Sequence, residues 1–166
     1  MGSGGGYGLS FGNTRGGVAA GDVSYMGSSD RFLHNIRNRS DVDPGGKFDV
    51  IAHGTPSSIE IEHNGTKMEV NSRTAAQMIK RLPGYKRGQA IRLLSCSTGT
   101  RSDGFAQNLA NKLNATVYAP SDILWAYPSG RHIIAAAKPS SRDPNVMVPD
   151  LRRTGRFVKY TPGGNR

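Results

Sequence analysis

The chain has 166 residues, 36% of them hydrophobic, which suits one soluble domain with a buried core. It contains neither an apolar run approaching the ~20 residues of a membrane span nor a basic start followed by an apolar stretch typical of a signal peptide. A single cysteine, Cys96, excludes an intramolecular disulfide framework, and the net charge of +10 favours an anionic partner.

The first part of the chain carries few structural signals. Residues 1–21 are rich in glycine and serine, and a flexible segment with little fixed structure is expected there. Residues 22–166 are predicted to form a single domain. It starts with a short strand over residues 22–26, followed by a short helix over residues 30–37 with Asp30 at its N-cap.

Two short apolar runs each stop at one reactive residue. The first covers residues 47–53 and ends at His53; the second covers residues 89–96 and ends at Cys96. Runs of this length fit strands buried on both faces of a parallel sheet. The carboxyl ends of such strands form the crevice where open α/β sheets place their chemistry. We therefore expect His53 and Cys96 to share one edge of a sheet.

The elements around these strands follow from local patterns. Alternation flanking Asn64-Gly65 predicts a β-hairpin over residues 59–70. A helix is expected from Asn71 or Ser72 to Leu82, and a second helix, capped by Ser102 or Asp103, is expected to run through Leu113. Strands are then predicted at residues 115–120, 132–137 and 156–160, with residues 121–125 following the first of them and loop before the last one. This order predicts an α/β fold: a mostly parallel sheet flanked by helices, with a β-hairpin insertion and a β-rich C-terminal appendage.

His53 and Cys96 together are candidates for nucleophilic catalysis. A lone cysteine or a lone histidine is more often structural, but both residues at strand ends favour a function. A thiol attacks as thiolate, and we expect its pKa to be lowered by His53 and by a nearby helix N-terminus. Cys96 would attack a carbonyl and His53 would protonate the leaving amine. The backbone N–H groups of Gly54 and Cys96 are candidate donors for an oxyanion hole.

The same residues resemble a known group of enzymes. An apolar strand ending in His53-Gly54, followed by one ending in Ser95-Cys96, is similar to the caspase-like cysteine peptidases, which include caspases, gingipains, clostripain and self-processing toxin domains. The toxin domains are most similar, because a small-polar loop and a helix like residues 104–110 also follow their cysteine. Residues 52–56 and 93–99 also look like the C-terminal domains of polymorphic, Rhs-like toxins. The resemblance covers residues 48–125.

The resemblance implies a caspase-like cysteine endopeptidase that acts as a bacterial toxin effector or a self-processing toxin domain. It implies a His53/Cys96 dyad with Gly54 in the oxyanion hole, and a substrate pocket built from the loops after the core strands. Asp122 and Trp125 lie on such a loop and are the candidate pocket residues; a hydrophobic lid is the structural alternative for Trp125. The motif around Cys96 differs from the Gln-Ala-Cys-Arg-Gly of caspases, so aspartate specificity is not implied.

The resemblance also implies where the protein acts and which partners it has. The expected substrate is a protein, an immunity protein is an expected partner, and no cofactor is needed. The chain would be secreted or delivered into a target cell as part of a larger bacterial protein, and would work in a reducing cytoplasm. From residue 131 onward the sequence contains eight Lys and Arg residues but only two acidic ones, Asp143 and Asp150, so an anionic ligand is expected in that region. Related toxin proteases bind inositol hexakisphosphate on a basic flap, which makes an inositol polyphosphate a candidate activator.

Other functions stay open or are disfavoured by the residues. A cysteine phosphatase needs arginine six places after its cysteine, but position 102 is serine and Arg101 falls one short. The four histidines show no metal-ligand spacing, so no metal site is predicted. The net charge keeps a basic nucleic-acid-targeting toxin domain, either a nuclease or a binding domain, as an alternative. A thiol-dependent deamidase or transferase on the same fold is another.

Overall fold

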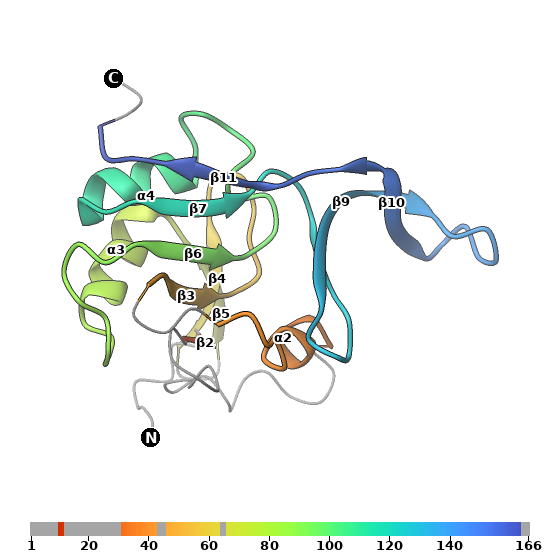
Figure 1. Cartoon of the computed structure of the whole chain (residues 1–166), viewed down its shortest axis with the longest axis horizontal. Coiled ribbons are helices and arrows are strands. Elements are labelled where there is room, and N and C mark those ends of the chain that lie inside the picture. The colour runs from red at the N-terminus through yellow and green to blue at the C-terminus, as the bar shows by residue number, and fades with distance from the viewer. Residues whose placement is uncertain (1–9, 12–30, 43–45, 64–65, 164–166) are drawn as a thin grey trace.

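A five-stranded, partly parallel sheet forms the centre of the chain. The structure, a computed structural model, describes residues 10–11, 31–42, 46–63 and 66–163. The strand order is β11-β7-β6-β3-β2; the three inner strands are parallel and the two outer ones antiparallel (Figure 1). The strands are β2 (Ser10–Phe11), β3 (Phe48–Ile51), β6 (Ile91–Leu94), β7 (Val117–Pro120) and β11 (Phe157–Tyr160). The predicted α/β fold is confirmed, but the sheet, which was expected to be mostly parallel, is only partly parallel, because β2 and β11 pair antiparallel at its two edges.

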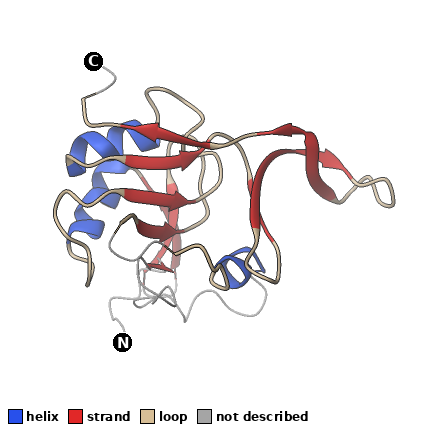
Figure 2. Ribbon diagram, in the orientation of Figure 1, coloured by secondary structure: helices blue, strands red, loops and turns tan. Residues whose placement is uncertain are grey.

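Two helices cover one face of this sheet (Figure 2). They are α3 (Ser72–Lys80) and α4 (Phe105–Leu113). Their buried residues and alternate residues of the strands form the main hydrophobic core, because successive strand residues point to opposite faces. Its largest fully buried side chains include Phe48, Phe105, Ile79, Leu93 and Leu109. The sheet is thereby fixed against a rigid helical layer on this face.

The starts of the two helices differ in how they are capped. The Asn71 side chain accepts a hydrogen bond from the N–H of Thr74 at 3.0 Å, so the predicted cap of α3 is confirmed. The prediction of Ser102 or Asp103 as the cap of α4 is wrong, because Gly104 occupies that position without a side-chain bond. Backbone carbonyls satisfy the first turn instead: the N–H of Phe105 donates to the carbonyl of Pro56 in the loop after β3, and that of Ala106 donates to the carbonyl of Thr98 in the loop before the helix.

A second, smaller core lies on the other side of the sheet. It is formed by α2 (Arg31–Ile36), by the sheet residues Ile51 and Leu94, and by a three-stranded antiparallel sheet of order β10-β9-β8. The strands of that sheet are β8 (Leu124–Ala126), β9 (His132–Pro139) and β10 (Met147–Thr154). The segment predicted as loop before residue 156 is therefore β-structure. β10 contains no buried residue, so its sequence lacks the alternation that predicts a strand.

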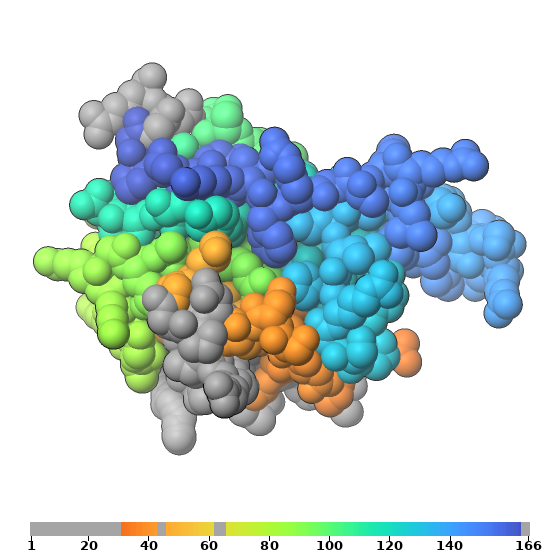
Figure 3. Space-filling model, in the orientation of Figure 1, coloured from red at the N-terminus to blue at the C-terminus, as the bar shows by residue number. Residues whose placement is uncertain are grey.

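The strands β9 and β10 form an arm, residues 132–154, which extends away from the five-stranded sheet (Figure 3). A second hairpin, β4 (Ile59–His63) with β5 (Thr66–Val70), confirms the predicted insertion. The predicted strand at residues 22–26 and the Asp30 cap lie outside the described residues. Ser10–Phe11 pair with β3, so the expected lack of structure is wrong at these two positions. None of the described helices is long and apolar enough to cross a bilayer.

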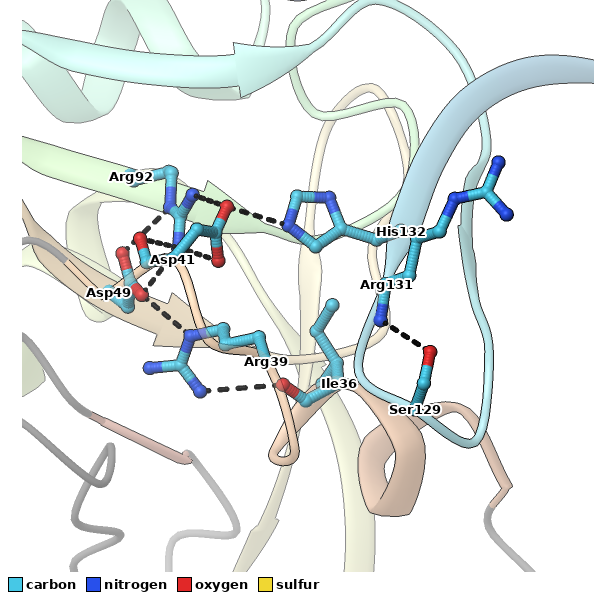
Figure 4. Close-up of polar contacts among 8 residues, drawn as sticks. All are labelled: Ile36, Arg39, Asp41, Asp49, Arg92, Ser129, Arg131 and His132. Atoms are coloured by element: carbon cyan, nitrogen blue, oxygen red, sulfur yellow. Dashed lines mark hydrogen bonds and ion pairs between the residues drawn. The ribbon is translucent and has the colours of Figure 1, made fainter.

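A buried network of charges joins these parts (Figure 4). Asp49 of β3 lies directly opposite Arg92 of β6, which binds its carboxylate through Nε and Nη2 at 2.9 and 2.8 Å. Arg39, which follows α2, binds the same carboxylate at 2.8 Å, and the side chains of Arg39 and Asp49 are 0% and 2% exposed. The network continues to the surface through Asp41, which contacts both Arg92 and His132 of β9. Four segments of the chain are thus held by charge-assisted hydrogen bonds.

Asp41 shows the strength of this network. Burial alone would raise its pKa, but the hydrogen bond and charge of Arg92, with a smaller effect of His132, lower the pKa to about 2. The pKa of Asp41 in the folded protein lies below its ordinary value of 3.8. The ionised Asp41 carboxylate therefore contributes fully to the stability of the fold above pH 3.8, and this contribution is lost as the pH falls towards 2.

We predict that Asp49→Asn strongly destabilises the fold. The variant keeps the side-chain size but removes the buried negative charge that Arg39 and Arg92 share, and breaking a buried ion pair costs about 3–5 kcal/mol. The measurement is the free energy of unfolding in urea. Asp150→Asn is the matched control, because Asp150 pairs with an exposed arginine, Arg153, and its loss should cause no measurable change. Equal stability of the two variants would contradict the role given to the network.

Candidate functional site

His53 and Cys96 follow neighbouring strands at the same edge of the sheet. Each residue of β6 lies 43 positions after its partner in β3, as the pairs Phe48 with Ile91 and Ile51 with Leu94 show. Cys96 lies 43 positions after His53, so the two residues are at the same level just beyond the paired region. The predicted position at a common carboxyl edge agrees with this register.

Both side chains also belong to the face of the sheet that carries α2. The His53 ring lies 5.3 Å from the ring of Phe32, measured between centroids and tilted by 37°. Phe32 and Cys96 are both partly buried against the second core. The alternation along the strands explains this common side, since Ile51 and Leu94, two positions earlier in each strand, belong to the same core.

Gly54 brings the loop after β3 directly onto the loop after β6. A Cβ atom at this position would lie 2.2 Å from the Ser95 Oγ and 2.8 Å from the carbonyl oxygen of Cys96, so a side chain does not fit. Gly54 forms an isolated antiparallel bridge with Ile59, in which the bonds run from Thr55 N to Ser58 O and from Glu60 N to His53 O. The N–H of Gly54 takes no part in that bridge, as is usual for a non-hydrogen-bonded antiparallel pair.

The Cys96 thiol is held by the backbone of β8. Its Sγ accepts a hydrogen bond from the N–H of Leu124 at 3.4 Å and lies 3.6 Å from the Leu124 carbonyl oxygen. Burial raises the pKa of the thiol, the Asp122 charge raises it further, and the N–H groups of Leu124 and Cys96 only partly offset this. The prediction of a lowered thiol pKa is therefore wrong: the resting thiol is protonated at neutral pH.

A strained turn follows the cysteine. Ser97 has φ +61°, a left-handed conformation that side chains other than glycine rarely adopt. The turn is held from outside, because Ser97 N donates to the carbonyl of Asp122 at 3.0 Å and Gly99 N donates to that of Pro120 at 2.8 Å. Strain of this kind, fixed by its surroundings, is typical of functional loops.

The two candidate pocket residues lie beside this turn, between β7 and β9. Asp122 accepts a bond from the N–H of Ile123 through Oδ1 at 2.8 Å, and its side chain is partly exposed. The Trp125 indole N–H donates to the carbonyl of Ala135 at 2.9 Å, which fixes the ring against β9. Asp122 acts on the thiol through its charge, whereas the defined contact of Trp125 is structural.

Several residues of the site have no signal in the sequence. Phe32 lies on a predicted short helix and Leu124 follows a predicted strand, but nothing in their spacing indicates contact with His53 or Cys96. Ser95 is another: its hydroxyl is fully buried and has no hydrogen-bond partner among the described residues. The described residues contain no group of three or more His, Cys, Asp and Glu side chains that could hold a metal ion.

Comparison with known proteins places the chain in a family. A family model described as "Domain of unknown function (DUF8616)" matches residues 21–134. The chain belongs to this family. It is also 32% identical over 85 residues to the uncharacterized protein YibJ of Escherichia coli (strain K12), a match that covers 51% of this chain and 34% of YibJ. The chain thus matches about a third of that protein's length. No solved structure matches the chain.

The DUF8616 match contains the whole candidate site. It includes His53, Gly54 and Cys96 as well as the loop with Asp122 and Trp125. It ends at residue 134, inside β9, so most of the β9–β10 arm and the edge strand β11 lie beyond it. The residues of the candidate site thus all lie within the segment that matches the family model.

We predict that Gly54→Ala separates the two loops and destabilises the fold. The added methyl group overlaps the Ser95 hydroxyl and the Cys96 carbonyl, and overpacking of this kind costs about 1–3 kcal/mol. Unfolding in urea measures the loss. Ser95→Ala should recover part of it in the double variant, because it removes the nearest atom. A double variant with no recovery would contradict the overlap.

We also predict the pH dependence of thiol alkylation. Because the thiol pKa is raised above its usual value of 9.0, reaction with iodoacetamide should be slow at neutral pH and increase only at higher pH than for an exposed cysteine. Asp122→Asn should shift the rate profile to lower pH, since it removes a negative charge that raises this pKa. Asp103→Asn is the control, and half-maximal reaction near pH 7 in the native chain would contradict the prediction.

Proposed function

We propose that the chain is a cysteine endopeptidase of caspase-like architecture, with Cys96 as nucleophile and His53 as general acid and base. The observation that supports this most is the β3–β6 register, which sets His53 and Cys96 at one level on one face of the sheet. Gly54 adds to it, because its contact with Ser95 and Cys96 brings the two loops together.

The raised pKa of the thiol defines how the dyad would work. With a protonated thiol at rest, His53 takes the Sγ proton while the sulfur attacks the substrate carbonyl carbon. The N–H groups of Gly54 and Cys96 stabilise the negative oxygen that forms. His53 then gives the proton to the leaving amine, and a thioester to Cys96 remains. Water, deprotonated by His53, hydrolyses the thioester and regenerates the thiol.

The surroundings of the site favour particular substrates. The Asp122 charge acts on the thiol, so a cationic side chain next to the scissile bond would be attracted to the same place. The substrate would be a protein in the cell that receives the toxin, and an immunity protein would protect the producer. Transfer of the acyl group to an acceptor other than water would make the same site a transferase, and an amide side chain as substrate would make it a deamidase.

We predict that both dyad residues are required for cleavage. The native chain is incubated with an extract of whole proteins, and new peptide amino termini are identified by mass spectrometry. Cys96→Ala and His53→Ala should each reduce their formation by at least about a thousandfold, as loss of a nucleophile or base does in related dyads and triads. His34→Ala, an exposed histidine on α2, is the matched control and should retain activity.

Three outcomes would overturn the peptidase. New termini that persist in Cys96→Ala would exclude this nucleophile. Modified substrates without new termini, dependent on Cys96, would indicate a deamidase or transferase. Nucleic-acid degradation or binding that is unchanged in Cys96→Ala and falls with increasing salt would instead support a basic nucleic-acid-targeting domain.

A further inference from the structure

A basic hollow lies at the opposite edge of the sheet from His53 and Cys96. It has a volume of about 340 Å³ and is bordered by Lys80, Arg87 and Lys112, with Tyr85 and Leu113 as apolar wall. Residues 81–90 lead into the start of β6, and residues 114–116 lead into the start of β7. The hollow therefore lies at the amino ends of the parallel strands, where Figure 1 shows the ends of α3 and α4.

The three cationic side chains come from three separate elements, and the sequence segments around them contain no acidic residue. Lys80 and Lys112 belong to the last turns of α3 and α4, while Arg87 belongs to the connecting loop. Residues 71–90 and 104–121 contain no Asp or Glu. Within the described chain no carboxylate pairs with any of the three, in contrast to Arg39, Arg92 and Arg153. The charges of Lys80 and Lys112 interact favourably with the negative C-terminal ends of the helix dipoles of α3 and α4. Arg87 lies on a loop and has no helix end to interact with in this way.

The loop that carries Arg87 has a defined conformation. The Gln89 side chain accepts a bond from Lys86 N at 3.1 Å and donates to the Gly46 carbonyl at 2.9 Å. The Tyr85 hydroxyl donates to the Gln89 carbonyl at 3.3 Å, and its ring packs edge-on against Phe48 at 5.5 Å. Arg87 is thus held on a loop with a defined conformation between two helix ends that carry Lys80 and Lys112, and such preorganisation lowers the cost of binding.

We propose that this hollow binds a small organic diphosphate, whose phosphate groups lie between Lys80, Arg87 and Lys112. Three unpaired cations around one hollow suit an anion with more than one charge, and arginine and lysine are the usual phosphate ligands. The volume is at the lower end of the ~300–1,000 Å³ of small-molecule pockets, so one small ligand fits. Tyr85 and Leu113 would contact its uncharged part. This site is distinct from the anion site expected after residue 131, and it does not depend on the proposed peptidase activity.

The test is isothermal titration of the full chain with inorganic pyrophosphate and with ADP. The pocket variant is Lys80→Gln with Arg87→Gln and Lys112→Gln. The arm variant, Lys138→Gln with Arg142→Gln and Arg152→Gln, changes the net charge equally at residues distant from the hollow. The native chain and the arm variant should bind both ligands, ADP more tightly, and the pocket variant should bind at least tenfold more weakly. Matching circular dichroism spectra and melting temperatures show that the variants fold.

Other results would overturn the proposal. Equal weakening in the pocket and arm variants would show attraction by net charge alone, and no binding by the native chain would exclude the site. Vesicles containing a phosphoinositide are a further arm: binding to them that needs the three residues, without binding of pyrophosphate or ADP, would assign the hollow to a lipid headgroup. The same pattern with a single-stranded oligonucleotide would assign it to nucleic acid.

Discussion

The pairing of Asp49 with Arg92 is the interaction on which the rest of the structure depends. The two residues are direct partners in the parallel ladder, and the carboxylate is almost completely buried. A shift of one residue would move Asp49 away from Arg92 and exchange the core-facing residues of the strand for those of the opposite face. Because a buried carboxylate tolerates no such loss, this ion pair selects one register, and that register sets His53 level with Cys96.

The site lies where two differently built halves of the molecule meet. One face of the central sheet is covered by α3 and α4, and the other holds the charge network and the second core with α2 and β8. His53 contacts Phe32 of α2, whereas the sulfur of Cys96 contacts the backbone of Leu124 in β8. The close contact of Gly54 with Ser95 joins the two loops. Each reactive side chain is therefore positioned by a different neighbour, and the sheet supplies only their common level.

Much of the central sheet could be predicted because its inner strands are mostly apolar and end abruptly at turn residues. The Asn71 cap and the hairpin around residues 64–65 are equally local signals. In the arm, β9 matches the strand predicted from residue 132, but β10 could not be predicted, since it is stabilised by pairing with β9 and buries no residue of its own. The start of α4 and the pKa of the thiol depend on groups far away in the chain: the carbonyl of Pro56 in one case, and burial of the sulfur together with the N–H of Leu124 in the other. Local patterns carry no information on such contacts.

The position of Leu124 links the cysteine to the second sheet. Leu124 pairs with Ile134 of β9, and its N–H is the backbone group that approaches the sulfur from outside the cysteine's own loop. The acidity of Cys96 is consequently a property of how the two sheets are docked, and less of the residues next to it in sequence. A substitution in β9 that shifts β8 would therefore also change the hydrogen bond to Cys96. Cys96 is the only cysteine in the sequence, so this shift would affect the one sulfur that can form a disulfide or a thioester.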